Sequence, residues 1–258
     1  MKIIGIIQAR MGSTRLPGKM LLSLGGKLVI EHVFGRARAA KKISQVVLAT
    51  TTSPADDPLA AWATEQGIPY FRGSESDVLD RYYECAKLFE ADAVVRLTGD
   101  CPLLDPQVID GVVDAYVSVD GKYEYVSNIH PPTFPDGLDT EVFSFGALEK
   151  AWREAALQSE REHVTPYIWK NPEIFPASNV LCAIDGKSIN LSEERWTLDT
   201  PSDFNFLRAV VEHLESGEDK SDFSSIFNLI NTNPDWRDIN AGQTRNEGYA
   251  KSLQEDDE

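Results

Sequence analysis

Residues 3–19 have the sequence IIGIIQARMGSTRLPGK, an apolar run followed by a basic loop that contains glycine. The run Ile3–Ile7 is continuous and rich in β-branched residues, which is typical of a parallel strand covered on both faces. Glycine lets backbone N–H groups approach a ligand closely, and arginine and lysine neutralise phosphate oxygens. The segment therefore predicts a buried strand with a phosphate-binding loop at its carboxyl end, although a basic surface loop would have the same composition.

Strand-like and helical segments alternate through the residues that follow. Helices are recognised by apolar side chains at 3.6-residue spacing and by proline at the first helical position. Strands are expected at 46–50, 69–71 and 93–98, and helices at 28–40, 56–66, 77–90 and from 106 onward. This alternation predicts an α/β fold with a mostly parallel sheet and flanking helices, which binds ligands beyond the carboxyl ends of its strands.

The pattern changes after residue 120. Strands are expected at 123–126, 141–145, 179–184 and 194–198, helices at 147–157 and 160–171, and a capped helix from Pro201. A single compact domain with an inserted or appended region is the simplest interpretation. The acidic end, residues 254–258, is expected to be solvated and frayed.

Composition argues against a nucleic-acid-binding, membrane-bound or disulfide-rich protein. The 258 residues include 25 Lys and Arg against 41 Asp and Glu, a formal net charge of −16. Such a charge disfavours binding to nucleic acid or to an anionic membrane over the whole surface. The three cysteines have no paired spacing, which argues against a disulfide framework and favours a reducing cytoplasm. No apolar run approaches membrane-spanning length.

Two aspartates, Asp100 and Asp199, each follow an expected strand and precede a turn directed by proline. If the two strands are neighbours, both carboxylates converge at the edge of the sheet that carries the basic loop. Carboxylate oxygens beside phosphate groups are the ligands that Mg²⁺ prefers. The pair therefore predicts a magnesium site, while each aspartate taken alone is equally suited to capping a turn or a helix.

Six short stretches support a family resemblance. They are QARMGSTRLPGKML at 8–21, YFRG at 70–73, DVLDRY at 77–82, RLTGDCPL at 96–103, DGLDTE at 136–141 and REHVT at 161–165. Together they resemble the sugar-acid cytidylyltransferases, which include the 3-deoxy-manno-octulosonate and acylneuraminate enzymes, and most closely their spore-coat polysaccharide branch, called SpsF-like. The resemblance extends from residue 1 to about residue 210.

The resemblance implies Mg²⁺-dependent transfer of CMP from CTP to a sugar acid, with release of pyrophosphate. It also implies a Rossmann-like domain of the nucleotide-diphospho-sugar transferase type, often a homodimer. In this interpretation one domain, 1–258, is divided into a nucleotide-binding half (1–120), a sugar-binding and dimerisation region that returns to the sheet (121–215), and a C-terminal helix with an acidic tail (216–258).

The matching motifs also imply residue roles. The catalytic group would be Arg10, Lys19 and Asp100, and the metal ligands would be Asp100 and Asp199. The nucleotide would be held by Gln8, Ala9, Arg10, Gly12, Ser13, Arg15, Lys19, Arg72 and Arg81. The sugar would be contacted by Thr98, Asp139, Glu141, Glu162 and His163, although Asp136 with Gly137 is suited to turn formation and His163 to a surface or capping position. Cys101 is expected to be a packing residue, since no histidine lies near it in the sequence to activate it.

The sequence also departs from the family pattern. In the octulosonate enzymes the aspartate is preceded by Gln-Gly and followed by Glu, whereas here Thr98 takes the glutamine position and Cys101 follows. Because that glutamine contacts the sugar, the acceptor stays open. Three other hypotheses remain: a nucleotidyltransferase that uses UTP, GTP or a different sugar; a nucleotide-sugar glycosyltransferase, although such enzymes commonly show an Asp-x-Asp motif; and a non-catalytic nucleotide-binding or scaffold protein.

Overall fold

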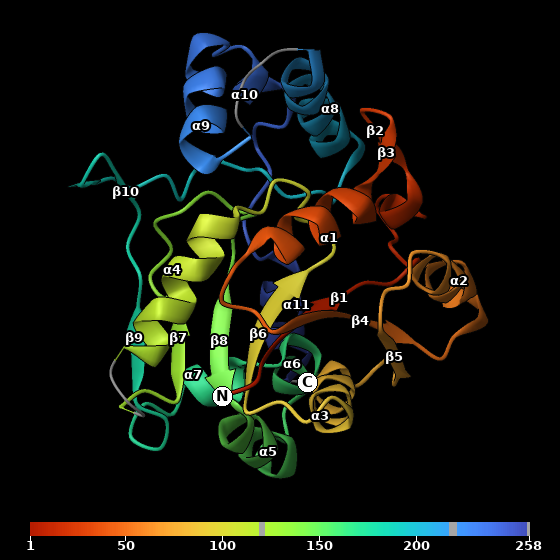
Figure 1. The fold of residues 1–258 in the computed structure, drawn as a ribbon, viewed down its shortest axis with the longest axis vertical. Coiled ribbons are helices and arrows are strands. Elements are labelled where there is room, and N and C mark those ends of the chain that lie inside the picture. The colour runs from red at the N-terminus through yellow and green to blue at the C-terminus, as the bar shows by residue number, and fades with distance from the viewer. Residues whose placement is uncertain (119–121, 217–220, 257–258) are drawn as a thin grey trace.

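The central feature of the computed structural model, which describes residues 1–118, 122–216 and 221–256, is a seven-stranded sheet (Figure 1). The strand order is β5-β4-β1-β6-β8-β7-β9. The first four strands are parallel, β8 runs antiparallel to β6 and β7, and β9 is parallel to β7. The strands are β1 (Ile3–Gln8), β4 (Gln45–Thr51), β5 (Tyr70–Gly73), β6 (Ala93–Thr98), β7 (Tyr125–Ser127), β8 (Glu141–Ser144) and β9 (Ala177–Asn179). The predicted α/β fold with a mostly parallel sheet is confirmed.

Helices cover both faces of this sheet (Figure 1). On one face lie α1 (Val29–Ala39), α2 (Asp57–Glu65) and α4 (Pro106–Val117), and on the other lie α3 (Val78–Leu88) and α5 (Phe145–Glu154). Because successive side chains of a strand point to opposite faces, Ile3 and Ile7 join the first core and Ile4 and Ile6 join the second. Each such isoleucine contributes roughly 1.5–3 kcal/mol when fully buried, which explains the continuous apolar run.

A third apolar cluster lies beyond one end of the sheet (Figure 1). It joins α8 (Pro201–Ser216) and α9 (Phe223–Thr232) to the small hairpin of β2 (Ser23–Leu24) and β3 (Lys27–Leu28). The predicted start of α8 is confirmed: Asp203 accepts hydrogen bonds from the backbone N–H of Thr200, and the Thr200 hydroxyl accepts one from the N–H of Asp203. The predicted border near residue 120 lies outside the described residues.

The strand expected at 194–198 is wrong. Trp196 N–H donates to Asp136 O at 2.6 Å, whereas Leu198 N–H donates to Asp100 O at 2.8 Å. Because these acceptors belong to two different loops, no ladder forms, and the segment is extended with only an isolated bridge between Asp136 and Arg195.

Two other expectations near the C-terminal half need correction. The helix expected at 160–171 is split into α6 (Gln158–His163) and α7 (Pro166–Trp169), because Val164 between them has a φ of 72° and Pro166 lacks an N–H donor. The strand expected at 179–184 is divided between β9 and β10 (Ala183–Ile184), which pairs with β11 (Lys187–Ser188).

The acidic end is structured, against expectation. Helix α11 (Glu247–Asp256) packs against α6, and the Asp256 carboxylate accepts a hydrogen bond from Ser159 N–H at 2.9 Å. The prediction of a frayed end is therefore wrong for residues 254–256, and residues 257–258 lie outside the described part of the chain. Among the described helices, none has the length and apolar character needed to cross a membrane.

Candidate functional site

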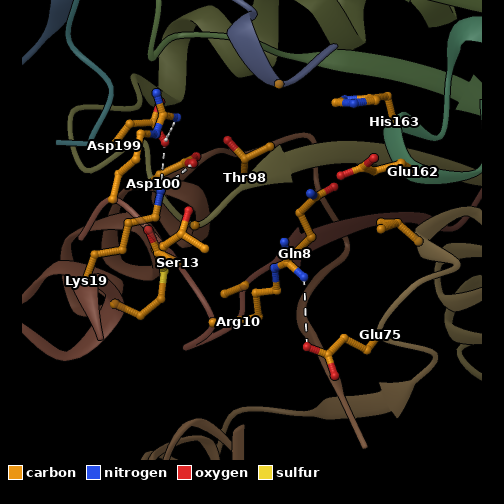
Figure 2. A pocket seen from close by; sticks show the side chains of 18 of the residues that line it. Gln8, Arg10, Ser13, Lys19, Glu75, Thr98, Asp100, Glu162, His163 and Asp199 are labelled. Carbon is orange, nitrogen blue, oxygen red and sulfur yellow. Dashed lines mark hydrogen bonds and ion pairs between the residues drawn. The ribbon is translucent and has the colours of Figure 1, made fainter. Parts of the chain in front are cut away.

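The adjacent carboxyl ends of β1 and β6 form the floor of a pocket of about 620 Å³ (Figure 2). Gln8 pairs with Thr98 in the sheet, and Gly99 N–H donates to Gln8 O at 2.9 Å. A Cβ atom at Gly99 would lie 2.8 Å from the Cβ of Ala9, so only glycine permits this close approach. The pocket therefore lies where the parallel sheet was predicted to bind its ligand.

Hydrogen bonds to its backbone fix the conformation of the basic loop that follows β1. The buried Asp56 carboxylate accepts a hydrogen bond from Met11 N–H at 2.6 Å, and the Ser13 hydroxyl accepts one from Leu16 N–H at 3.2 Å. These contacts fix the backbone, while Arg10 and Arg15 remain exposed at the pocket. The loop thus presents two guanidinium groups at the pocket, where Arg15 pairs with Glu247 and Asp199 and Arg10 lies 3.9 Å from Glu75.

Lys19 joins the two aspartates that the sequence predicted to converge (Figure 2). Its Nζ lies 3.0 Å from Asp100 Oδ2, 3.0 Å from Asp199 Oδ1 and 2.7 Å from Leu198 O. Burial by itself would lower the pKa of the Lys19 ammonium, but the two carboxylates raise it above its ordinary value. Likewise burial would raise the pKa of Asp100, and Lys19 brings it below its ordinary value. Lys19 and Asp100 are therefore charged at neutral pH.

The donor chemistry of this cluster fits Mg²⁺ only in part. Asp100 and Asp199 supply hard carboxylate oxygens that both face one cation, Lys19. Among the described residues, no group of three or more His, Cys, Asp and Glu side chains is arranged to hold a metal ion. Magnesium usually binds one or two carboxylates and completes its shell with water and phosphate oxygens. The residues therefore fit a metal that arrives with a nucleotide triphosphate, and the site remains a prediction.

Most residues singled out in the sequence meet in this pocket. Its lining includes Gln8, Ala9, Arg10, Gly12, Ser13, Arg15, Lys19, Arg81, Thr98, Asp100, Glu162, His163 and Asp199. These side chains come from β1 and its loop, β6, α3, α6 and the segment before α8. The structure thus brings together segments that are almost 200 residues apart, although the individual roles stay predictions.

Three predicted residues lie outside the pocket lining. Arg72 donates from Nε to Thr51 O at 2.8 Å and pairs with Asp57. Asp139 accepts a hydrogen bond from Arg245 Nη2 at 2.5 Å. Glu141 is 1% exposed, because β8 places it within the sheet and its carboxylate faces inward. In this structure the three side chains have structural partners in place of a nucleotide or a sugar.

Helix α11 contributes a pocket wall that the sequence did not reveal. Glu247, Gly248 and Lys251 line the pocket, and Glu247 Oε2 accepts a hydrogen bond from Arg15 Nη1 at 2.7 Å. The helix docks through Ser252, which is 3% exposed. Its hydroxyl donates to Glu162 Oε2 at 2.8 Å and lies 3.1 Å from His163 Nε2. The sequence carries no local signal for this role, because the burial of Ser252 arises only when α11 packs against α6.

Ser252→Val is expected to loosen α11. Valine cannot bond to Glu162 or His163, and leaving buried polar groups unpaired costs about 1–3 kcal/mol. Amide hydrogen exchange in α11 should therefore accelerate roughly tenfold or more, since 1.4 kcal/mol is a factor of ten. Leu253→Val, which introduces the same side chain at a more exposed neighbouring position, is the control and should exchange like the parent protein. Equal exchange rates in both variants would contradict the docking role of Ser252.

Comparison with known proteins gives the family. A family model described as cytidylyltransferase matches residues 4–226. The spore coat polysaccharide biosynthesis protein SpsF of Bacillus subtilis is 34% identical over 238 residues, which cover 90% of this chain and 95% of that protein. An uncharacterized protein of Methanocaldococcus jannaschii is 38% identical over 241 residues, 93% and 95% of the two chains.

A solved structure agrees with this result. A cytidylyltransferase from Leptospira borgpetersenii superposes with a TM-score of 0.84 and 35% identity, and the match covers 95% of this chain and 98% of that one. The family match spans the strands, the basic loop and both aspartates of the pocket. The chain therefore belongs to the cytidylyltransferase family.

Proposed function

We propose that this cytidylyltransferase transfers CMP from CTP to a sugar acid in glycan or polysaccharide biosynthesis, with Mg²⁺ bound by Asp100 and Asp199. The observation that carries the proposal is the meeting of Lys19 with both carboxylates, directly beside the exposed Arg10 and Arg15. Three cations and two carboxylates around one pocket suit a metal-bound triphosphate, whereas a simple sugar would need no such arrangement.

The chemistry is in-line attack of an acceptor hydroxyl on the α-phosphorus of CTP. One P–O bond forms between the acceptor oxygen and the α-phosphorus, the P–O bond to pyrophosphate breaks, and the hydroxyl proton passes to water. Arg10 and Arg15 neutralise the departing pyrophosphate from the loop, and Lys19 supplies a buried positive charge from below. When bound, Mg²⁺ would add further neutralisation of phosphate charge. Positioning and electrostatics supply most of the acceleration in such reactions.

The base end of the pocket has a feature suited to cytosine. Gln8 Oε1 is buried and has no hydrogen-bond partner among the described residues. The exocyclic amino group of cytosine is a donor, whereas uracil presents a carbonyl acceptor at that place. Nearby, Arg81 is 2% exposed and donates to Ser74 O at 2.8 Å, which fixes the loop between β5 and α3. The orientation of the Gln8 amide in this structure therefore supports CTP over UTP.

The part of the pocket lined by α6 and α11 suits a polar, negatively charged acceptor. Glu162 and His163 of α6 and Lys251 of α11 line it. Burial, followed by the charge of Arg96, lowers the pKa of His163, so the imidazole is neutral at pH 7. Its Nε2 faces Ser252, which leaves Nδ1 as the nitrogen that would bond to a sugar hydroxyl. Lys251 of α11 is the cation beside Glu162 and His163 in this lining that would meet a sugar carboxylate. The SpsF relative, named for spore coat polysaccharide biosynthesis, supports the proposed role in polysaccharide biosynthesis.

A nucleotide and acceptor panel tests the proposal. Purified protein with Mg²⁺ is incubated with CTP, UTP, GTP or ATP and with a set of sugar acids and neutral sugars, and pyrophosphate release and product mass are recorded. We expect pyrophosphate release with CTP and a sugar acid, and a product heavier by CMP. Turnover with UTP or GTP but not with CTP would overturn the choice of nucleotide, and turnover with neutral sugars only would overturn the choice of acceptor.

A further inference from the structure

Arg195 lies directly behind Asp199, and it is not among the site residues predicted from the sequence. In the described part of the chain, its guanidinium bonds to three carboxylates: Asp136 Oδ2 at 3.0 Å, Asp199 Oδ2 at 3.0 Å and Asp203 Oδ1 at 2.9 Å. The side chain is 10% exposed and is not part of the pocket lining that contains Lys19. Arg195 is therefore close to the predicted metal site without facing the ligand space.

The guanidinium is itself fixed by buried groups. The Asp203 side chain is fully buried and accepts from Arg195 through both carboxylate oxygens. Asp203 also accepts hydrogen bonds from the N–H groups of Asp199 and Thr200 at the start of α8. Asn240, which follows α10 (Trp236–Ile239), donates to both Asp203 Oδ1 and Arg195 O. A planar guanidinium with bidentate partners holds one orientation better than a lysine ammonium would.

This anchor decides where the Asp199 carboxylate points. Arg195 occupies Asp199 Oδ2, so Asp199 Oδ1 is turned toward Lys19 at 3.0 Å and Arg15 at 3.3 Å. Without Arg195, rotation about the side-chain torsions would let either oxygen face the pocket or turn away from it. The Asp100 carboxylate has other partners, Lys19 Nζ at 3.0 Å from Oδ2 and Cys101 Sγ at 3.7 Å from Oδ1. The backbone carbonyl of Asp100 accepts from Leu198 N–H, which brings the two loops together.

We propose that Arg195 is a positioning residue that holds the Asp199 carboxylate in the orientation needed for the metal-bound triphosphate. The proposal rests on the proposed function, since it assigns Asp199 to the metal. Partners that orient metal ligands commonly change metal affinity or activity by about 10–100-fold when they are removed. Removing Arg195 should therefore raise the metal concentration needed for half-saturation and leave the KM for the acceptor unchanged.

The test compares Arg195→Met with Arg237→Met. Arg237 is also a partly buried, ion-paired arginine, which bonds to Glu194 at 2.6 Å away from the Lys19 pocket. Mn²⁺ serves as the probe, and its binding is measured by electron paramagnetic resonance with a non-hydrolysable CTP analogue present. We expect half-saturating Mn²⁺ to rise at least tenfold in Arg195→Met and to stay unchanged in Arg237→Met, with the acceptor KM unchanged in both. Unchanged Mn²⁺ binding in a folded Arg195→Met would overturn the proposal.

A double variant separates positioning from general destabilisation. In an Asp199→Asn background, Arg195→Met should add no further change in Mn²⁺ binding, because its effect passes through Asp199. An equal effect in both backgrounds would overturn the positioning role. If Asp199→Asn alone leaves Mn²⁺ binding unchanged, the metal assignment itself fails and the role of Arg195 fails with it. Arg195→Lys keeps the positive charge but has one nitrogen in place of three. Its half-saturating Mn²⁺ concentration should fall between those of the parent and Arg195→Met. If Arg195→Met does not fold, Arg195→Lys takes its place in the test.

Discussion

Asp100→Asn is expected to lower kcat for pyrophosphate release by on the order of 10³-fold. The variant removes one of the two negative charges beside Lys19, and with it the oxygen charge that a divalent cation requires. Asparagine has nearly the same size and keeps an oxygen that can accept from Lys19 Nζ. The fold should therefore persist, and the loss should appear in turnover at saturating Mg²⁺ and CTP, with an unchanged circular dichroism spectrum.

Asp114→Asn is the matched control for this change. Asp114 lies on α4 and forms an exposed ion pair with Lys42 at 2.9 Å, away from the pocket. It loses the same charge by the same substitution, so we expect turnover like that of the parent protein. Comparable turnover of Asp100→Asn and Asp114→Asn would contradict the assignment of Asp100 to catalysis.

Glu141→Gln is expected to lower the free energy of unfolding by about 3–5 kcal/mol, the usual cost of removing one partner of a buried ion pair. Glu141 is 1% exposed and accepts hydrogen bonds from Arg96, from Tyr125 at 2.7 Å and from Thr165 at 2.6 Å. Glutamine leaves the Arg96 charge uncompensated and directs an amide donor toward other donors. Urea unfolding at pH 7 measures the loss, and Glu154→Gln, in an exposed pair with Lys150, should change the midpoint far less.

The pH dependence of this loss has a definite sign. Burial by itself would raise the pKa of Glu141, but Arg96, with Thr165 and Tyr125, lowers it below its ordinary value of 4.5. A lowered pKa in the folded state means that the charged form stabilises the fold above the unfolded pKa, and that this contribution disappears as the pH falls through the folded value. The difference between parent and Glu141→Gln should therefore shrink in acid. Equal midpoints at pH 7 would contradict the structural role.

A second readout distinguishes this role from the sugar contact that the sequence predicted. If Glu141 acts structurally, the double variant Arg96→Met with Glu141→Leu should regain much of the lost stability, because no unpaired buried charge remains. If Glu141 contacts the acceptor, Glu141→Gln should raise the acceptor KM while the urea midpoint stays near that of the parent.

In the first half of the chain, strands and helices follow from patterns among residues that are close together in the sequence. The apolar run Ile3–Ile7 and the N-cap Asp105, whose carboxylate accepts from Gln107 N–H at 2.7 Å, depend on residues close together in sequence. Helical periodicity and capping act over a few residues, so a sequence pattern can show them. The extended segment 194–198 looks like a strand by the same rules, but its hydrogen-bond partners lie in distant loops and no local pattern specifies them.

By itself, the sequence determined the parallel α/β sheet, the basic loop at the end of its first strand, and the family to which those motifs belong. Only the tertiary structure decided that α11 walls the pocket, that Glu141 and Asp139 have protein partners, and that Arg195 stands behind Asp199. The physical reason is the separation in sequence between the interacting residues. Strand and helix periodicity arises within one segment, whereas a buried charge finds its partner only after segments far apart in the chain have packed together.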